Sequence, residues 1–217
     1  PSSAASDVYK RQTHYSVVAT PTQQGAMVIG VLDGVYGSPE VTDFAGNYLE
    51  EPRFVNVTYD SVDVEAELTR GYPDAHVRDG GVMYANFAPI EVALEFSEPV
   101  YGLTAGDLEL EGGGTPLAHS LADASGGDAT GFSVQIAPGA QGALNATLPF
   151  GVAEDLAGNP TLDTDVLLFV YDTVEPTATV TSTAPYNTNT SPVPFALALS
   201  ERCFTGAEEN FTVTNGA

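Results

Sequence analysis

Short motifs in this chain return at fixed distances, and this repetition constrains the fold more than any other feature. DFAGN at residues 43–47 recurs as DLAGN at residues 155–159. YDSV at residues 59–62 recurs as YDTV at residues 171–174, so both pairs lie 112 positions apart. A period of this length is the size of a whole domain and far exceeds a solenoid turn. The sequence therefore predicts domain-sized units in series, and nothing yet points to an active site.

Two further offsets complete the pattern. APIEVALEFSE at residues 88–98 matches SPVPFALALSE at residues 191–201, an offset of 103 positions with Ser-Glu at the end of both copies. HYSVV at residues 14–18 matches GFSVQ at residues 131–135, an offset of 117 positions. The shorter offset arises because the stretch 71–84 carries extra residues. Insertions of variable length belong in loops, so we expect a loop there.

These offsets divide the chain into one complete unit and two partial ones. We predict the C-terminal half of one unit over residues 13–62, a complete unit over 63–174 and the N-terminal half of the next over 175–217. The chain therefore resembles a piece of a longer array. SSAASDVYKRQ at residues 2–12 resembles the translation of a transposase adapter used to build sequencing libraries. We therefore treat residues 1–12 as an adapter-derived, disordered segment and expect a metagenomic fragment.

The hydrophobic pattern predicts β-strands throughout. Apolar side chains alternate with other residues at Ile90, Val92, Leu94 and Phe96, which is the period of a half-buried strand. No segment of ten or more residues shows a helical period. Six or seven short strands in about a hundred residues favour an all-β, antiparallel β-sandwich in each unit. The other predicted strands cover residues 64–68, 108–110, 132–136, 144–148, 166–171, 177–180 and 193–199.

Three separated pieces carry a family resemblance. SEPVYGLTAGDLELEGG at 97–113, LPFGVAEDLAGNP at 148–160 and YDTVEPTATV at 171–180 resemble the bacterial immunoglobulin-like (Ig-like) tandem repeats of secreted and surface adhesin-type proteins. The resemblance covers residues 13–217. It implies Ig-like sandwiches that act as stalk, spacer or adhesin modules, some of them calcium-dependent and some appended to secreted enzymes. It does not imply catalysis.

The charge of the chain limits its partners. Asp and Glu number 29 against 6 Lys and Arg, which gives a formal net charge of −23. Such a surface repels nucleic acid and anionic membranes, and we expect neither partner. No apolar run reaches the length of a membrane span, so membrane insertion is not expected either. An acidic surface is instead compatible with divalent cations.

Calcium is the best candidate ligand because hard cations need several oxygen ligands. Carboxylates gather in and after the second DxAGN turn and around the linker that follows it. Asp60 and Asp63 flank the preceding linker in the same way. The alternative is that the first Asp and the Asn of this motif make an Asx turn, in which Gly158 adopts a positive φ. The candidate ligands are Asp155, Asn159, Asp163, Asp165, Asp172 and Glu175.

Signals for other chemistry are weak. His14, His76 and His119 lack the spacing of a metal site, and His119 with Ser120 makes a poor catalytic pair. Cys203 stands alone, so no internal disulfide can form, and its alignment with Val100 favours a small buried apolar role. We therefore predict no enzymatic activity and no catalytic residues.

The sequence thus predicts a non-catalytic spacer or stalk segment of a large extracellular or cell-surface adhesin-like protein. Its first partners would be neighbouring repeats of the same polypeptide. Two alternatives remain open: an accessory Ig-like segment of a secreted multidomain hydrolase, and a module that binds extracellular glycan or protein. Tyr72 and Tyr84 in the insertion are the residues that could stack on a sugar.

Overall fold

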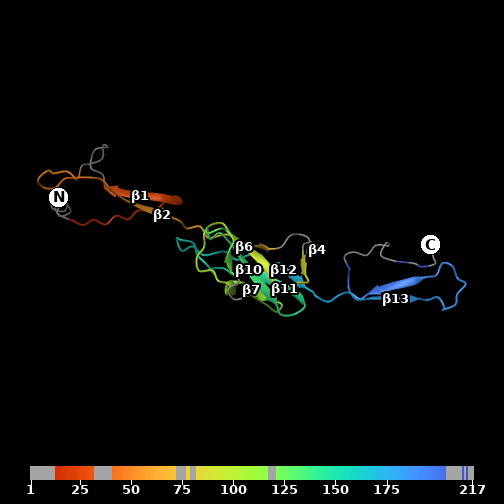
Figure 1. Ribbon diagram of the computed structural model, residues 1–217. Helices are drawn as coiled ribbons and strands as arrows, with labels where there is room; N and C mark the ends of the chain where they lie inside the picture. Colours follow the sequence, from red (N-terminus) through yellow and green to blue (C-terminus); the bar gives the residue numbers. More distant parts are fainter. Residues whose placement is uncertain are drawn as a thin grey trace, which may run out of the picture.

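The computed structural model describes residues 13–31, 41–71, 77–78, 82–116, 121–203, 212 and 214 (Figure 1). The adapter-like residues 1–12 lie outside this part of the chain. The described residues form strands and connecting loops, and the helical residues among them are the single 3-10 turn η2 (Ala105–Asp107). The prediction of an all-β chain is confirmed. The molecule is elongated in Figure 1, with a central unit of two sheets (residues 63–174) and a two-stranded hairpin on either side.

Two five-stranded sheets make up the central unit. The first sheet has the order β3-β6-β10-β8, with β9 also paired to β10. Its strands are β3 (Ala66–Arg70), β6 (Ile90–Phe96), β8 (Gly114–Pro116), β9 (Ala122–Asp123) and β10 (Gly131–Pro138). The second sheet has the order β4-β5-β12-β11-β7. Its strands are β4 (Val77–Arg78), β5 (Val82–Ala85), β7 (Glu109–Glu111), β11 (Gly142–Thr147) and β12 (Leu167–Tyr171).

The two sheets enclose one hydrophobic core. On β6 the alternation predicted from the sequence is observed, because every second side chain from Ile90 to Phe96 is buried. The second sheet supplies buried side chains to the same core from β5, β11 and β12. The prediction of a β-sandwich is therefore confirmed for this unit. Its largest fully buried side chains include Phe169, Met83, Ile90, Leu94, Ile136, Leu144 and Leu148.

The insertion at residues 71–84 does not form the simple loop expected from its variable length. Val82–Ala85 is a strand, β5, which runs parallel to β12 with Met83 opposite Phe169. Met83 and Ala85 are buried, while Tyr84 between them is partly exposed. The insertion therefore extends the second sheet and covers part of the core, because its apolar residues alternate as those of a half-buried strand do. This pairing is parallel, whereas the sequence predicted antiparallel neighbours only.

The segment that leads into the central unit is fixed before β3 begins. Val64 is fully buried and forms a parallel bridge with Thr161. The Val64 amide donates to the Pro160 carbonyl over 3.0 Å, and the Leu162 amide donates to the Val64 carbonyl over 2.8 Å. Thr161 is also buried, and its hydroxyl accepts a hydrogen bond from the Ala153 amide. The first residues of the unit are thus attached to the segment that precedes its last strand, β12.

The N-terminal hairpin repeats the geometry of two strands in the second sheet. It consists of β1 (Gly25–Val31) and β2 (Arg53–Tyr59), which pair with Gly25 opposite Tyr59 and Met27 opposite Val57. In the central unit β11 and β12 pair with Gly142 opposite Tyr171 and Leu144 opposite Phe169. These partners are 117 positions apart on the first strand and 112 on the second. The register therefore agrees with both sequence offsets.

The C-terminal hairpin repeats a pair from the first sheet. It consists of β13 (Ala178–Ser182) and β14 (Phe195–Leu199), with Ala178 opposite Leu199. The corresponding pair in the central unit is Ala66 opposite Phe96, 112 and 103 positions earlier. A side-chain contact recurs as well: the Glu65 amide donates to the Ser97 hydroxyl over 3.0 Å, and the Thr177 amide donates to the Ser200 hydroxyl over 2.8 Å.

Candidate functional site

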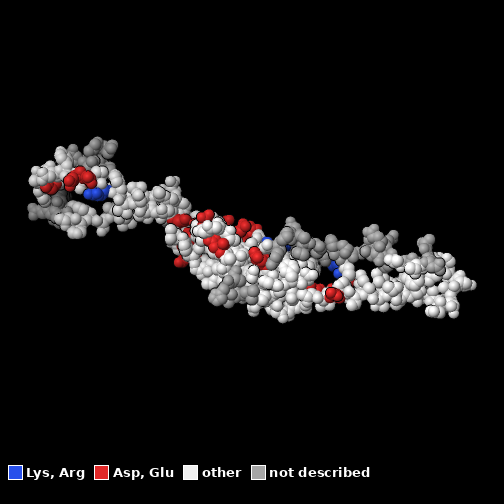
Figure 2. Space-filling view, viewed as in Figure 1, with Lys and Arg blue, Asp and Glu red and all other residues white. Residues whose placement is uncertain are grey.

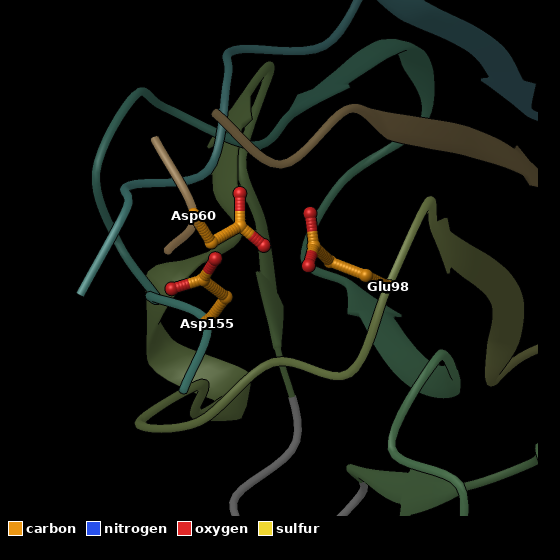
Figure 3. A group of neighbouring side chains, drawn as sticks. All are labelled: Asp60, Glu98 and Asp155. Carbon is orange, nitrogen blue, oxygen red and sulfur yellow. The ribbon is translucent and has the colours of Figure 1, made fainter. Parts of the chain in front are cut away.

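Three carboxylates meet where the N-terminal hairpin joins the central unit. Asp60 follows β2, Glu98 follows β6, and Asp155 lies in the loop between β11 and β12. One carboxylate oxygen from each residue lies within 4.8 Å of the other two. Figure 3 shows the three side chains directed toward one another. We call these residues the carboxylate cluster. It contains residues from both sides of the joint, since Asp60 precedes the central unit and the other two belong to it.

A tight turn holds the Asp155 side chain in place. One carboxylate oxygen, Oδ1, accepts hydrogen bonds from the Ala157 amide over 2.7 Å and the Asn159 amide over 2.9 Å. The other, Oδ2, accepts from the Asn159 side-chain amide over 2.8 Å. Gly158 has a φ of 91°, a conformation that glycine adopts without steric cost. The Asx turn considered from the sequence is therefore present, and it leaves Asp155 facing the cluster.

The cluster is electrostatically unfavourable without a counter-charge. Burial raises the pKa of the Glu98 carboxyl above its usual value, and the nearby charges of Asp60 and Asp155 raise it further. Burial also acts to raise the pKa of Asp155, but the hydrogen bonds from Asn159, Ala157 and Gly158 outweigh it and the net shift is downward. Asp155 therefore keeps its negative charge. The ionised form of Glu98 is disfavoured beside it.

The spacing of the cluster suits a hard divalent cation. Calcium binds oxygen at 2.3–2.6 Å, so two ligands on opposite sides of one ion are about 5 Å apart at most. The oxygens of Asp60, Glu98 and Asp155 satisfy this limit. Three carboxylates supply up to six oxygens, which is the lower end of calcium coordination. A bound cation would also remove the repulsion that raises the pKa of Glu98.

The six candidates predicted from the sequence do not lie together. Asp155 belongs to the cluster, and Asn159 contributes by holding it. The remaining four join no group of three acidic, histidine or cysteine side chains within the part of the chain that the structure describes. Asp163 and Asp165 are exposed in the loop before β12. Asp172 directly follows β12, and Glu175 is exposed in the next linker.

Sequence reasoning did not assign Glu98 to the site, although one signal could have found it. Ser97 and Glu98 recur as Ser200 and Glu201, and the YDSV motif that contains Asp60 also recurs. Two acidic residues that repeat with the units, on either side of a linker, are candidates for one shared site at each joint. What the sequence could not supply was the fold, which brings the loop that follows β6 next to the DLAGN turn.

The second joint holds the equivalents of two cluster members. Asp172 corresponds to Asp60, and its carboxylate accepts a hydrogen bond from the Val174 amide as Asp60 accepts one from the Val62 amide. Glu201 corresponds to Glu98. An equivalent of Asp155 at this joint, at the same offset of 103 positions that relates Glu98 to Glu201, would fall past residue 217.

The other predicted signals form no site among the described residues. His14 is exposed on the N-terminal segment, and Tyr84 lies on β5. His76, His119, Ser120 and Tyr72 lie outside the described residues. Cys203 is exposed, which contradicts the buried role inferred from its alignment with Val100. Val100 belongs to the core between two five-stranded sheets, whereas the sheet nearest Cys203 in the described residues has only the two strands β13 and β14.

Comparison of the chain with family models, curated proteins and solved structures gave no match. None of the helical segments in the described residues is long and apolar enough to cross a membrane.

Proposed function

We propose that this chain is a non-catalytic spacer segment of a large extracellular or cell-surface protein built from tandem Ig-like repeats. The observation that carries the proposal is the recurrence of strand registers. The β11–β12 pairing recurs in β1–β2, and the β3–β6 pairing recurs in β13–β14, each at the offset of the repeated motifs. The segments that hold these pairs follow one another along an extended molecule (Figure 1).

The linkers support a spacer role. Asp60–Val62 and Asp172–Val174 have the same local hydrogen bond from an amide to the first Asp. Gln24 bonds to Ser61 through both its amide nitrogen and its oxygen, and Gln141 bonds to Thr173 in the same way. Each linker is thus fixed to the hairpin before it. A short, fixed connection keeps successive units at a constant distance, whereas a flexible linker lets them collapse together.

Calcium is the cofactor that this arrangement favours, bound at the carboxylate cluster of the joint. Asp60 lies on one side of the joint, and Glu98 and Asp155 lie on the other. An ion shared between the two sides would resist bending there, since any bend changes the ligand distances. The acidic surface of the central unit in Figure 2 is compatible with an ion-rich exterior and with the absence of nucleic acid and membrane partners.

Small-angle X-ray scattering of the dilute chain tests the proposal. We expect the distance distribution of an elongated particle, with a maximum dimension about twice that of the central unit or more. This dimension should change little between low salt and 0.5 M salt, because the connections are hydrogen-bonded and do not depend on charge repulsion. A compact particle with a single symmetric maximum would rule the spacer role out.

A second measurement separates the spacer from the glycan-binding alternative. A glycan array probed with the labelled chain should give signals at background level. Reproducible binding to one sugar class, lost on Tyr84→Ala, would favour the alternative instead.

A further inference from the structure

The two hairpins expose sheet faces whose counterparts in the central unit are buried. On β14 Leu197 is 42% exposed, while its equivalent Leu94 on β6 is 1% exposed. On β2 Val57 is 46% exposed, while its equivalent Phe169 on β12 is 1% exposed. Large uncovered apolar faces mark sites of association.

Each hairpin lacks the sheet that the other one supplies. The C-terminal hairpin corresponds to β3 and β6 of the first sheet, and the N-terminal hairpin corresponds to β11 and β12 of the second sheet. In the central unit these four strands face each other across the core. Placing β1–β2 over β13–β14 would therefore rebuild the same sandwich.

Within the part of the chain that the structure describes, the C-terminal hairpin also has no third strand beside it. In the central unit β6 pairs with β10, but β14 has no second neighbour among the described residues. The equivalent of β10 is the segment at residues 14–21, which lies outside the strands of the structure. There Val17 is 74% exposed, while its equivalent Val134 is 1% exposed. The N-terminal segment thus has the sequence that corresponds to the strand next to β6, and β14 has an edge where such a strand could pair.

Charge does not oppose this pairing, although the chain has a formal net charge of −23. Residues 13–31 and 177–200 contain no Asp, Glu, Lys or Arg. In Figure 2 the end that holds the C-terminal hairpin is accordingly almost free of charged side chains, while acidic residues gather over the central unit. The repulsion expected between two such acidic molecules is weakest at these two surfaces.

We propose that a second copy of this chain covers each hairpin, so that the N-terminal segment and hairpin of one molecule complete a sandwich with the C-terminal hairpin of the next. The two hairpins of one molecule lie at opposite ends of it, with the central unit between them (Figure 1). They therefore cannot pair with each other. The contact joins two different surfaces, and such head-to-tail contacts produce closed rings where the rotation between molecules closes and open chains where it does not. This inference concerns the 217-residue chain by itself and does not depend on the spacer role.

The repeat offsets fix the register of the new contact. In the central unit β10 and β6 pair antiparallel with Ser133 opposite Ala93. The equivalents of these residues are Ser16 and Ala196. The residue beside Ser16 is Val17, whose side chain would enter the rebuilt core next to that of Phe195.

Light scattering during size-exclusion chromatography tests the association. The molar mass of the chain should rise to at least twice the monomer mass between micromolar and high-micromolar concentration. Leu197→Glu places a charge in the contact and should keep the molecule monomeric. Ala198→Glu is the matched control, because its equivalent in the central unit is already an exposed glutamate, Glu95. A monomeric mass for the unaltered chain at every concentration, or an equal effect of the two variants, would overturn the proposal.

Disulfide cross-linking tests the register. In a Cys203→Ser background, oxidised Ser16→Cys/Ala196→Cys should give a ladder of dimers and higher multimers on a non-reducing gel. Ser16→Cys/Leu197→Cys should give little, because adjacent residues of a strand point to opposite faces. Equal ladders from both pairs would show that the association has no defined register and would contradict the proposal.

Discussion

Asp43 and Asp155 accept the same three hydrogen bonds from their turns, yet Asp155 is buried and Asp43 is exposed. In the first turn the donors to Asp43 are the backbone amides of Ala45 and Asn47 and the side-chain amide of Asn47. In the second turn the donors to Asp155 are the corresponding groups of Ala157 and Asn159. Asp155 is 5% exposed because the central unit closes around it. The local motif therefore determines the hydrogen bonds of the turn, and packing of the central unit determines whether the Asp is buried.

The first prediction uses this pair. Asp155→Ala removes both oxygens that accept these three part-buried hydrogen bonds, and we expect the melting temperature of the central unit to fall by about 5–10 °C. Asp43→Ala removes the same bonds where water replaces them, so the main transition should not move. Scanning calorimetry measures both. Equal shifts for the two variants would show that burial of Asp155 is irrelevant.

The core gives a second matched pair. Phe169→Ala empties a fully buried position, and we expect it to lower the free energy of unfolding by about 3–5 kcal/mol. Val57 is the equivalent residue on β2 and is half exposed, so Val57→Ala should change this free energy by about 0.5 kcal/mol or less. Urea titration followed by circular dichroism distinguishes the two, in dilute solution where association is absent. A large loss from Val57→Ala would mean that the hairpin is covered even in the monomer.

A third prediction concerns pH. Since the pKa of Glu98 is raised in the folded chain, folding becomes less favourable as pH rises from about 4.5 through that pKa, where the unfolded carboxyl has already ionised. Glu98→Gln should therefore raise the free energy of unfolding at pH 7 by about 0.5 kcal/mol and make no difference below pH 4. Glu109→Gln, on an exposed position of β7, is the control and should match the unaltered chain throughout. The reverse order at pH 7, with Glu98→Gln less stable in calcium-free buffer, would contradict the repulsion between the three carboxylates.

The fourth prediction concerns calcium. If the ion binds the folded chain alone, calcium at ten times its dissociation constant should add about 1.4 kcal/mol to the free energy of unfolding. Glu98→Gln should abolish the resulting rise in melting temperature, and Asp163→Asn should retain it because Asp163 is exposed outside the cluster. Chelation should return the unaltered chain to its starting value. No rise at millimolar calcium would remove the calcium proposal and leave the fold unaffected.

Much of the fold follows from local pattern. Alternation at Ile90–Phe96 predicts β6 with its bounds and its buried face. The registers of both hairpins, which the sequence did not predict, agree with the offsets of the repeated motifs. The strand β5 was missed because a length difference was interpreted as a loop, although Met83 and Ala85 carry the alternation of a strand. The parallel neighbour of β12 could not be inferred, since pairing between distant strands depends on the whole sheet.

The candidate site was predicted only in part for the same reason. Asp155 and its turn are local features, and the DLAGN motif indicates them directly. Glu98 comes from a loop 57 positions away in the sequence. Its place beside Asp155 depends on the packing of the two sheets, which no sequence spacing records. Asp163 and Asp165 are closer to Asp155 in the sequence than Glu98 is. They nevertheless lie outside the carboxylate cluster, and Glu98 belongs to it.

From the parallel bridge between Val64 and Thr161 we expect the central unit to resist force more strongly in one direction than in others. When the chain is pulled by its two ends, the bonds on either side of Val64 and those between β12 and β5 are loaded along their strands and must shear together. Force applied at a loop, perpendicular to the strands, would instead break the hydrogen bonds between neighbouring strands one after another. A chain of such units would withstand force best along its own length, which is the direction in which a tether is loaded.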